Sequence, residues 1–342
     1  MSGPQRLSQI DALRGIAAIA VVLFHFTTKF DELYGHAAAP LFSVPWGHLG
    51  VNLFFMISGF VIFMTLARTR TATDFLVSRF SRLYPAYWAA VGLTFAVVLL
   101  LGLPGKQVSA SAAALNLLMF HGLFRVPNVD GVYWTLLVEL IFYAWSLLAF
   151  QLGLLKHIHR ILWLALALRL SYFIALEGFD LKFSWTLSEL LILPYIAWFA
   201  CGIMVYRLTH GSDARRADLA VIAGALLLIG VVGSWTLAAL ALAFTGVLYL
   251  AASGRLPLLH FAGLIWLGEI SYTLYLLHEN IGWALMLQMK AVGFGTNTSI
   301  ALALLASLAL AWGLTRLVEK PSMAWIRDRY KARQAVRAPQ PQ

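Results

Sequence analysis

The sequence predicts an all-α, polytopic membrane protein with about ten transmembrane helices. Of its 342 residues, 61% are hydrophobic and only 12% are charged, whereas soluble domains average about 25% charged residues. The mean hydropathy is +0.80, and apolar stretches of membrane-spanning length recur along the chain. A soluble globular protein is therefore excluded. The first apolar stretch has polar residues in its middle and no small-residue cleavage site, so we expect no cleavable signal peptide.

The individual spans follow from the apolar stretches. The seventh and eighth stretches are separated only by Gly233 and Ser234, which predicts a tight hairpin of helices, and the ninth is long enough to tilt or break. We expect one transmembrane domain over residues 1–330 and a disordered cytoplasmic tail over residues 331–342, which read KARQAVRAPQPQ. The predicted spans are 10–28, 46–66, 83–103, 132–152, 161–176, 186–206, 218–233, 235–252, 261–289 and 299–318.

The loop charges predict the orientation of the chain. With the N-terminus in the cytoplasm, eighteen lysines and arginines fall on the cytoplasmic face and five on the opposite face, as the positive-inside rule expects. Both termini are therefore predicted to be cytoplasmic. The same bias accounts for most of the net charge of +10, so that charge does not indicate a nucleic-acid partner. The five residues on the opposite face are Lys29, Lys106, Arg125, Lys182 and Lys290.

The first span carries charge that an ordinary membrane helix lacks. Its sequence, IDALRGIAAIAVVLFHF, contains Arg14 and His25. Eleven residues of α-helix make three turns plus about 20°, so both side chains lie on one face, ~16 Å apart along the axis. Ionisable residues inside a membrane are costly and by default mark a pathway or a reaction site. This face of the first span is therefore a candidate functional site.

A carboxylate and a second histidine are predicted at the depth of His25. Counting 1.5 Å per residue along antiparallel spans places Glu139 in the same outer layer as His25, together with His278 and the adjacent Glu279. A histidine oriented by a carboxylate is the usual general base. The alternative is a buried histidine bonded to a carbonyl or hydroxyl. The single cysteine, Cys201, excludes an internal disulfide and a cysteine-cluster metal site, and no metal is expected.

Other polar residues are candidates with competing structural explanations. Arg79 and Arg82 in SRFSRLYP are three residues apart and share a helix face, which suits bidentate capture of phosphate or simple anchoring at the cytoplasmic surface. Asn52 lies in GVNLFFMISGF, whose glycines and Ser58 favour close helix packing. Trp134 is typical of an interface belt or of packing.

Six segments in fixed order resemble one family. They are IDALRGIAAIAVVLFHF, GVNLFFMISGF, SRFSRLYPAYW, VYWTLLVELIFY, ISYTLYLLH and VEKP. Together they are similar to the membrane-bound acyltransferase-3 family of bacterial carbohydrate O-acyltransferases, from Ile10 to Pro321. The resemblance implies a stand-alone form without the SGNH domain that many members carry.

The resemblance also implies roles for the candidate residues. His25 would be catalytic, with Glu139 at the acidic position of the family. Cytoplasmic acyl-CoA, most simply acetyl-CoA, would be the donor. We assign three arginines to the donor and three residues to the acceptor. The donor residues are Arg14, Arg79 and Arg82, and the acceptor residues are His278, Asn52 and Trp134. The acceptor would be a hydroxyl of a carbohydrate or lipid-linked glycan, such as exopolysaccharide or O-antigen, at the bacterial inner membrane.

Two questions stay open at this level. His25 can act as a general base or can carry the acyl group as an acyl-imidazole. A transporter or flippase would use the same intramembrane charges as a substrate path, although no internal inverted repeat supports it. A structural subunit of a polysaccharide export complex would tolerate loss of His25.

Overall fold

The computed structural model describes residues 3–181 and 184–337, and this part of the chain is helical without a β-strand. Two π-helical turns, η1 (His25–Lys29) and η7 (Thr315–Glu319), interrupt the α-helices. The α-helices are α1 (Gly3–Phe24), α2 (Phe30–Tyr34), α3 (Gly50–Leu66), α4 (Ala72–Leu101), α5 (Ala110–Asn116), α6 (Trp134–Gln151), α7 (Ile158–Phe179), α8 (Trp185–Leu190), α9 (Ile196–Thr209), α10 (Arg215–Val232), α11 (Trp235–Ala252), α12 (Ala262–Leu277), α13 (Glu279–Ala291), α14 (Thr296–Leu314) and α15 (Lys320–Arg337).

Seven helical segments among the described residues are long and apolar enough to cross a membrane. Two predicted spans correspond instead to shorter apolar helices, α9 and α12. A third predicted span corresponds to α10. This helix has three charged residues in its first turn and is not among the seven segments. The chain is thus a multi-pass membrane protein, while the total of ten spans and the orientation stay predictions. The seven segments are Ser8–Tyr34, Pro45–Leu66, Ala72–Leu101, Gly131–Gln151, Leu154–Phe179, Trp235–Ala252 and Thr296–Gln334.

The chain forms two compact units, and each is assembled from three separate stretches of sequence. Unit 1 contains the chain up to Ile19, then His48–Arg68 and Thr135–Gly268. Unit 2 contains Ala20–Gly47, Thr69–Trp134 and the chain from Glu269 onward. The sequence predicts one domain over residues 1–330. No break in composition marks two units, because they interleave along the chain.

In unit 1, α3 and α9 pack closely through glycines. A Cβ atom on Gly202 would lie 1.8 Å from the carbonyl oxygen of Met56, and one on Gly59 would lie 2.4 Å from the carbonyl oxygen of Phe199. Small residues let membrane helices approach in this way. The packing role predicted for the glycines of GVNLFFMISGF is thereby confirmed at Gly59. α9 also packs against α10 and α11.

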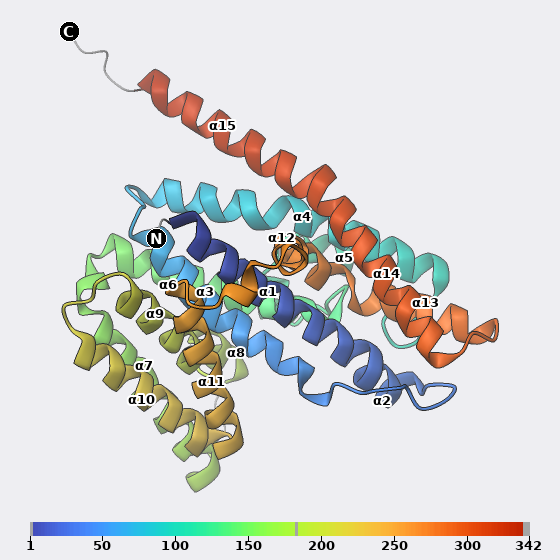
Figure 1. The fold of residues 1–342 in the computed structure, drawn as a ribbon, viewed down its shortest axis with the longest axis horizontal. Coiled ribbons are helices and arrows are strands. Elements are labelled where there is room, and N and C mark those ends of the chain that lie inside the picture. Colours follow the sequence, from blue (N-terminus) through green and yellow to red (C-terminus); the bar gives the residue numbers. More distant parts are fainter. Residues whose placement is uncertain (1–2, 182–183, 338–342) are drawn as a thin grey trace. The chain divides into compact units, whose positions relative to one another are not determined.

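In unit 2, α13 packs against α4 and α14, and α15 packs along α4 (Figure 1). α4 begins at a capping box, in which the Thr71 side chain accepts the backbone N–H of Asp74 and the Asp74 carboxylate accepts that of Thr71. The long ninth span is divided, because α12 ends at Leu277 and α13 begins at Glu279. His278 therefore lies where two helices meet.

The C-terminal segment departs from the sequence prediction. Residues 331–342 are predicted to be a disordered tail, yet α15 continues to Arg337. Tyr330 and Gln334 donate to the Asp74 carboxylate at 2.8 and 3.1 Å. These contacts with α4 hold a polar helix that composition alone does not stabilise. Residues 338–342 lie outside the described residues.

Candidate active site

His25 begins the π-helical turn η1, directly after α1. A π-turn adds one residue to a helical turn and is frequent at functional sites. The indole nitrogen of Trp283 donates to the His25 carbonyl at 2.9 Å, so α13 supplies a partner for the backbone at this turn. The His25 side chain is 13% exposed. It is therefore held among side chains of unit 2 while part of its ring stays accessible.

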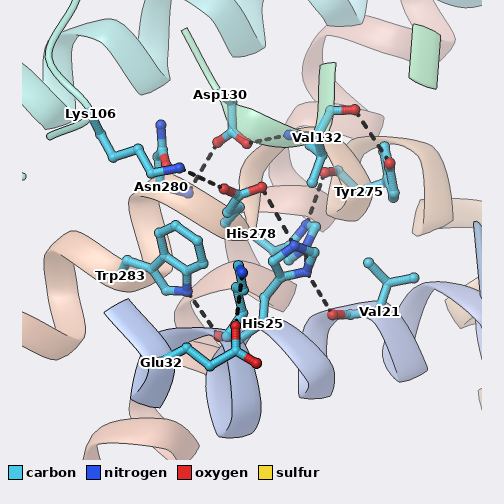
Figure 2. A network of polar contacts seen from close by, with 12 residues as sticks. Val21, His25, Glu32, Lys106, Asp130, Val132, Tyr275, His278, Asn280 and Trp283 are labelled. Atoms are coloured by element: carbon cyan, nitrogen blue, oxygen red, sulfur yellow. Dashed lines mark hydrogen bonds and ion pairs between the residues drawn. The ribbon is translucent and has the colours of Figure 1, made fainter. Parts of the chain in front are cut away.

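The hydrogen-bond partners determine the tautomers of the two site histidines. His278 Nδ1 lies 3.1 and 2.9 Å from the carbonyl oxygens of Leu274 and Tyr275, so Nδ1 carries the hydrogen and donates to them. In the neutral ring, His278 Nε2 is then an acceptor. It lies 3.1 Å from His25 Nδ1, which must be the donor because Nδ1 also lies 2.9 Å from the Val21 carbonyl oxygen. Figure 2 shows how Val21, His25, His278 and Tyr275 lie in this network.

This assignment leaves the lone pair of the neutral His25 ring on Nε2. That nitrogen lies 3.5 Å from Oε2 of Glu279, whose side chain is only 5% exposed. A proton taken up by His25 at Nε2 would therefore lie beside a buried carboxylate. The arrangement is that of a general base with a carboxylate that stabilises the imidazolium.

Lys106 contacts the same carboxylate from the connection between α4 and α5. Its Nζ lies 3.4 Å from Glu279 Oε1 and 4.9 Å from the centre of the Trp283 ring (Figure 2). The ammonium group offsets the charge of Glu279, and the aromatic face attracts the cation. Ionised groups are rarely buried without a partner, and Lys106 is a cationic partner of the Glu279 carboxylate.

Asp130 holds the first turn of α13 in place. Its Oδ2 accepts the backbone N–H of Asn280 at 3.1 Å, and its Oδ1 accepts that of Val132 at 3.3 Å. Asp130 thus caps the helix whose first residue is Glu279. Burial, and then the nearby Glu279 carboxylate, raise the pKa of Asp130 well above its usual value.

Gly131 leaves the space that the Glu279 carboxylate occupies. A Cβ atom at Gly131 would lie 2.3 Å from Oε1 and 2.7 Å from Oε2 of Glu279. Those separations are far inside van der Waals contact, so a larger residue at 131 would displace the carboxylate. Asp130 therefore holds the backbone of Asn280, the residue after Glu279, and Gly131 leaves room for the Glu279 carboxylate.

The sequence prediction for the carboxylate partner differs from this geometry. It pairs Glu139 with His25, and this pairing stays a prediction, whereas the structure places the Glu279 carboxylate 3.5 Å from His25 Nε2. Glu139 belongs to unit 1, where its Oε1 accepts hydrogen bonds from Ser58 at 2.9 Å and from Tyr143 at 2.5 Å. Depth counting places residues in a layer but does not decide which helices are neighbours.

The remaining predicted residues are distributed over both units. His278 lies against His25, as expected for residues of one site. Arg14, in unit 1, lies 4.0 Å from the Asp11 carboxylate. Asn52 is half-buried on α3 of unit 1, and Trp134 is an exposed residue in the first turn of α6. Their proposed roles with donor and acceptor stay predictions.

The arginine pair lies on α4 of unit 2. Arg82 forms an ion pair with Glu319, which is 1% exposed and ends the second π-turn. The Arg82 guanidinium also lies over the ring of Tyr272, 5.9 Å from its centre. His278 follows Tyr272 by six residues, which is ~9 Å of helix. The residue that Arg82 contacts, Tyr272, therefore lies about two turns of helix before His278 in the histidine site.

Two contributors to the site, Lys106 and Asp130, are missed by the sequence reasoning. In the sequence analysis, Lys106 serves only as one of the loop charges that predict the orientation of the chain. Asp130 lies just before the fourth predicted span, where no helical periodicity marks it as part of a site. The available signals are weak: a lysine in an otherwise apolar loop, and an Asp-Gly pair before a span. Glu279 has a stronger signal, since it follows His278 directly.

The fold and this site define a multi-pass membrane protein with a buried histidine–carboxylate centre. A sequence model of the acyltransferase-3 family, described as "Acyltransferase domain", matches residues 7–316. The chain belongs to this family and is a membrane acyltransferase. The matched segment contains residues of both compact units.

Two curated proteins are similar over nearly their whole lengths. The "Exopolysaccharide production protein ExoZ" of Rhizobium meliloti is 29% identical over 322 residues, covering 88% of this chain and 94% of the relative. The "Acyltransferase MdmB" of Streptomyces mycarofaciens is 26% identical over 378 aligned positions, covering 98% of this chain and 96% of the relative. No solved structure matches the chain.

Proposed function

We propose that this protein is an integral membrane O-acyltransferase that moves an acetyl group from cytoplasmic acetyl-CoA to a hydroxyl group of a carbohydrate. The observation that carries the proposal is the contact between His25 and a buried carboxylate, in which His25 Nε2 lies 3.5 Å from Glu279 Oε2. Acyl transfer to a hydroxyl needs a group that removes the hydroxyl proton as the new bond forms. The family supports acyl transfer, and the site supports this way of achieving it.

In the direct route, His25 Nε2 takes the proton of the acceptor hydroxyl. The acceptor oxygen forms a bond to the thioester carbonyl carbon, and the carbon–sulfur bond then breaks. The departing CoA thiolate receives the proton from the imidazolium. Glu279 stabilises the positive ring between these two proton transfers, while Lys106 contacts the carboxylate from its other side.

In the covalent route, His25 Nε2 attacks the thioester carbonyl itself. The carbon–sulfur bond breaks to give CoA thiolate and an acyl-imidazole. The acceptor oxygen then bonds to the acyl carbon, the carbon–nitrogen bond breaks to release the ring, and the hydroxyl proton passes by way of the released Nε2 to the CoA thiolate. Both routes need an unprotonated Nε2, so the tautomer derived above serves either one. They differ in whether labelled acetyl stays on the protein when no acceptor is present.

The donor is proposed to bind through Arg79 and Arg82. Guanidinium groups recognise phosphate with paired hydrogen bonds, and the two arginines belong to the same compact unit as His25. The ~9 Å of α12 between Tyr272 and His278 can be bridged by the thin pantetheine arm of CoA. Arg14 remains a further candidate for the donor site.

The acceptor is proposed to be a carbohydrate hydroxyl, on an exopolysaccharide unit or a related glycan. Similarity over 94% of an exopolysaccharide production protein supports this class. His278, Asn52 and Trp134 are the candidate acceptor residues. The predicted location is the bacterial inner membrane, where cytoplasmic acetyl-CoA and membrane-bound glycan intermediates are both within reach.

The test is acceptor-dependent release of CoA by the purified protein in lipid vesicles. We expect His25→Ala to lower the rate by at least ~10²-fold, the usual contribution of a general base. His157→Ala is the matched control, because His157 is an exposed histidine in unit 1. A His25→Ala variant with wild-type activity would remove the catalytic assignment. Labelled acetyl on His25 without acceptor would select the covalent route.

A further inference from the structure

Three arginines converge on one turn of α4, although the sequence shows only two of them as a motif. The Arg79 guanidinium donates to Ser78 Oγ at 3.1 Å. From α15, Arg327 donates through Nε to Ser81 Oγ at 3.1 Å and through a terminal nitrogen to the Ser78 carbonyl at 3.4 Å. Arg82 lies on the same turn. Three permanent positive charges are therefore gathered within one short stretch of helix.

Two carboxylates lie near this arginine cluster. Glu319 is ion-paired with Arg82. Asp74, one turn earlier on α4, accepts hydrogen bonds from Tyr330 and Gln334 and from its own capping box. Like charges held close together repel each other, so an anion would stabilise the cluster.

We propose that Arg79, Arg82 and Arg327 form one binding site for phosphate groups, with Arg327 as the third and previously unrecognised ligand. Rigid planar guanidinium groups from two helices suit a ligand that carries several phosphate oxygens. Arg327 lies beyond residues 7–316, the segment matched by the family, so the motif on α4 alone does not reveal it. If the proposed function holds, the bound phosphates are those of the acyl-CoA donor.

Two sources can supply this phosphate chemistry, the acyl-CoA donor and an anionic phospholipid headgroup. The experiment measures binding of CoA, pyrophosphate and phosphatidylglycerol to the full-length protein in nanodiscs or vesicles. Arg327→Gln removes the charge but keeps hydrogen-bond donors for Ser81, which limits damage to the packing of α15. Arg327→Lys keeps the charge without the planar fork. Arg329→Gln is the matched control on the same helix, since Arg329 is exposed and lies over the Trp325 ring, 4.8 Å from its centre.

We expect Arg327→Gln to weaken binding of CoA and pyrophosphate about tenfold, the effect of losing one charge-assisted hydrogen bond. Arg327→Lys should fall between this variant and the wild type, and Arg329→Gln should stay within twofold of the wild type. Unchanged binding of all three probes in Arg327→Gln would overturn the site. If only phosphatidylglycerol binding falls, the phosphate site stands as a lipid site. In that case these arginines do not hold the donor, and that part of the proposed function fails.

Discussion

At the scale of the residue, the chemistry of His25 depends on which nitrogen carries its hydrogen. The carbonyl oxygens of Leu274 and Tyr275 orient His278, and His278 together with Val21 orients His25. Backbone carbonyl groups therefore hold the orientation of both rings and favour a hydrogen on each Nδ1. Such an arrangement keeps Nε2 of His25 directed at Glu279 without any contribution from substrate.

The carboxylate assignment gives a direct comparison between two variants. We expect Glu279→Gln to lower acyl transfer strongly, because an amide cannot stabilise the imidazolium as a carboxylate does. The loss should be smaller than the ~10²-fold or more expected for His25→Ala. Glu139→Gln is the matched variant, since Ser58 and Tyr143 can still donate to the amide oxygen. Rates at saturating donor decide between them. A large loss in Glu139→Gln alone would restore Glu139 as the partner of His25.

Gly131 offers a steric test of the same carboxylate. Gly131→Ala places a Cβ atom 2.3 Å from Glu279 Oε1, so the carboxylate must leave its present position beside His25. We expect transfer to fall toward the level of Glu279→Gln while expression and membrane insertion persist. Gly92→Ala is the control, because a Cβ atom at Gly92 meets nothing within 4 Å. Normal activity in Gly131→Ala would show that the position of Glu279 is not critical.

At the scale of the element, irregular turns in the helices change the direction in which polar side chains point. η1 begins at His25, η7 ends at Glu319, and α12 gives way to α13 at His278. Each irregularity coincides with a charged or titratable residue of the histidine site or the arginine cluster. Backbone departures of this kind are frequent at functional positions.

The packing of α3 against α9 is sensitive to the size of the side chains between the two helices. Gly202→Ala would bring Cβ to 1.8 Å from the Met56 carbonyl oxygen, so the two helices must separate. Overpacking of this kind costs about 1–3 kcal/mol, and we expect a lower unfolding temperature in detergent. Gly246→Ala on α11 is the control, because its Cβ meets nothing within 4 Å. An unchanged unfolding temperature in Gly202→Ala would show that α3 and α9 are not tightly packed.

At the scale of the whole molecule, the loop charges predict which ends of the helices face the cytoplasm. The prediction places the arginine cluster near the cytoplasmic face and Lys106 near the opposite face. A donor from the cytoplasm would then meet the arginines first and the histidines deeper in the membrane. The proposed direction of acyl transfer depends on this orientation.

Cysteine accessibility tests the orientation. Cys201 is the single cysteine of the chain and is buried, so Cys201→Ala provides a clean background. We expect single cysteines at the exposed positions Gln107 and Arg125 to react with an impermeant reagent added outside intact cells. Cysteines at Arg70 and Asp213 should react only after the membrane is opened. Reversal of any one position would require a different number of spans before it.

Much of the architecture follows from the sequence alone. Hydropathy specifies an all-helical membrane protein, and the two residues between α10 and α11 specify their hairpin. Helical periodicity places Arg79 and Arg82 on one face, and depth counting brings His278 to the level of His25. These properties are local, because each depends on the composition or spacing of residues within one or two neighbouring segments.

The tertiary structure alone decided the partners across the site. Glu279 lies beside His25, Lys106 contacts that carboxylate, and Arg327 reaches the arginine pair from a segment predicted to precede a disordered tail. Each of these contacts joins positions far apart in the sequence. They depend on which helices pack together and on how a π-turn or a helix junction rotates a side chain, and neither property is encoded in periodicity or in the depth of a residue within its own span.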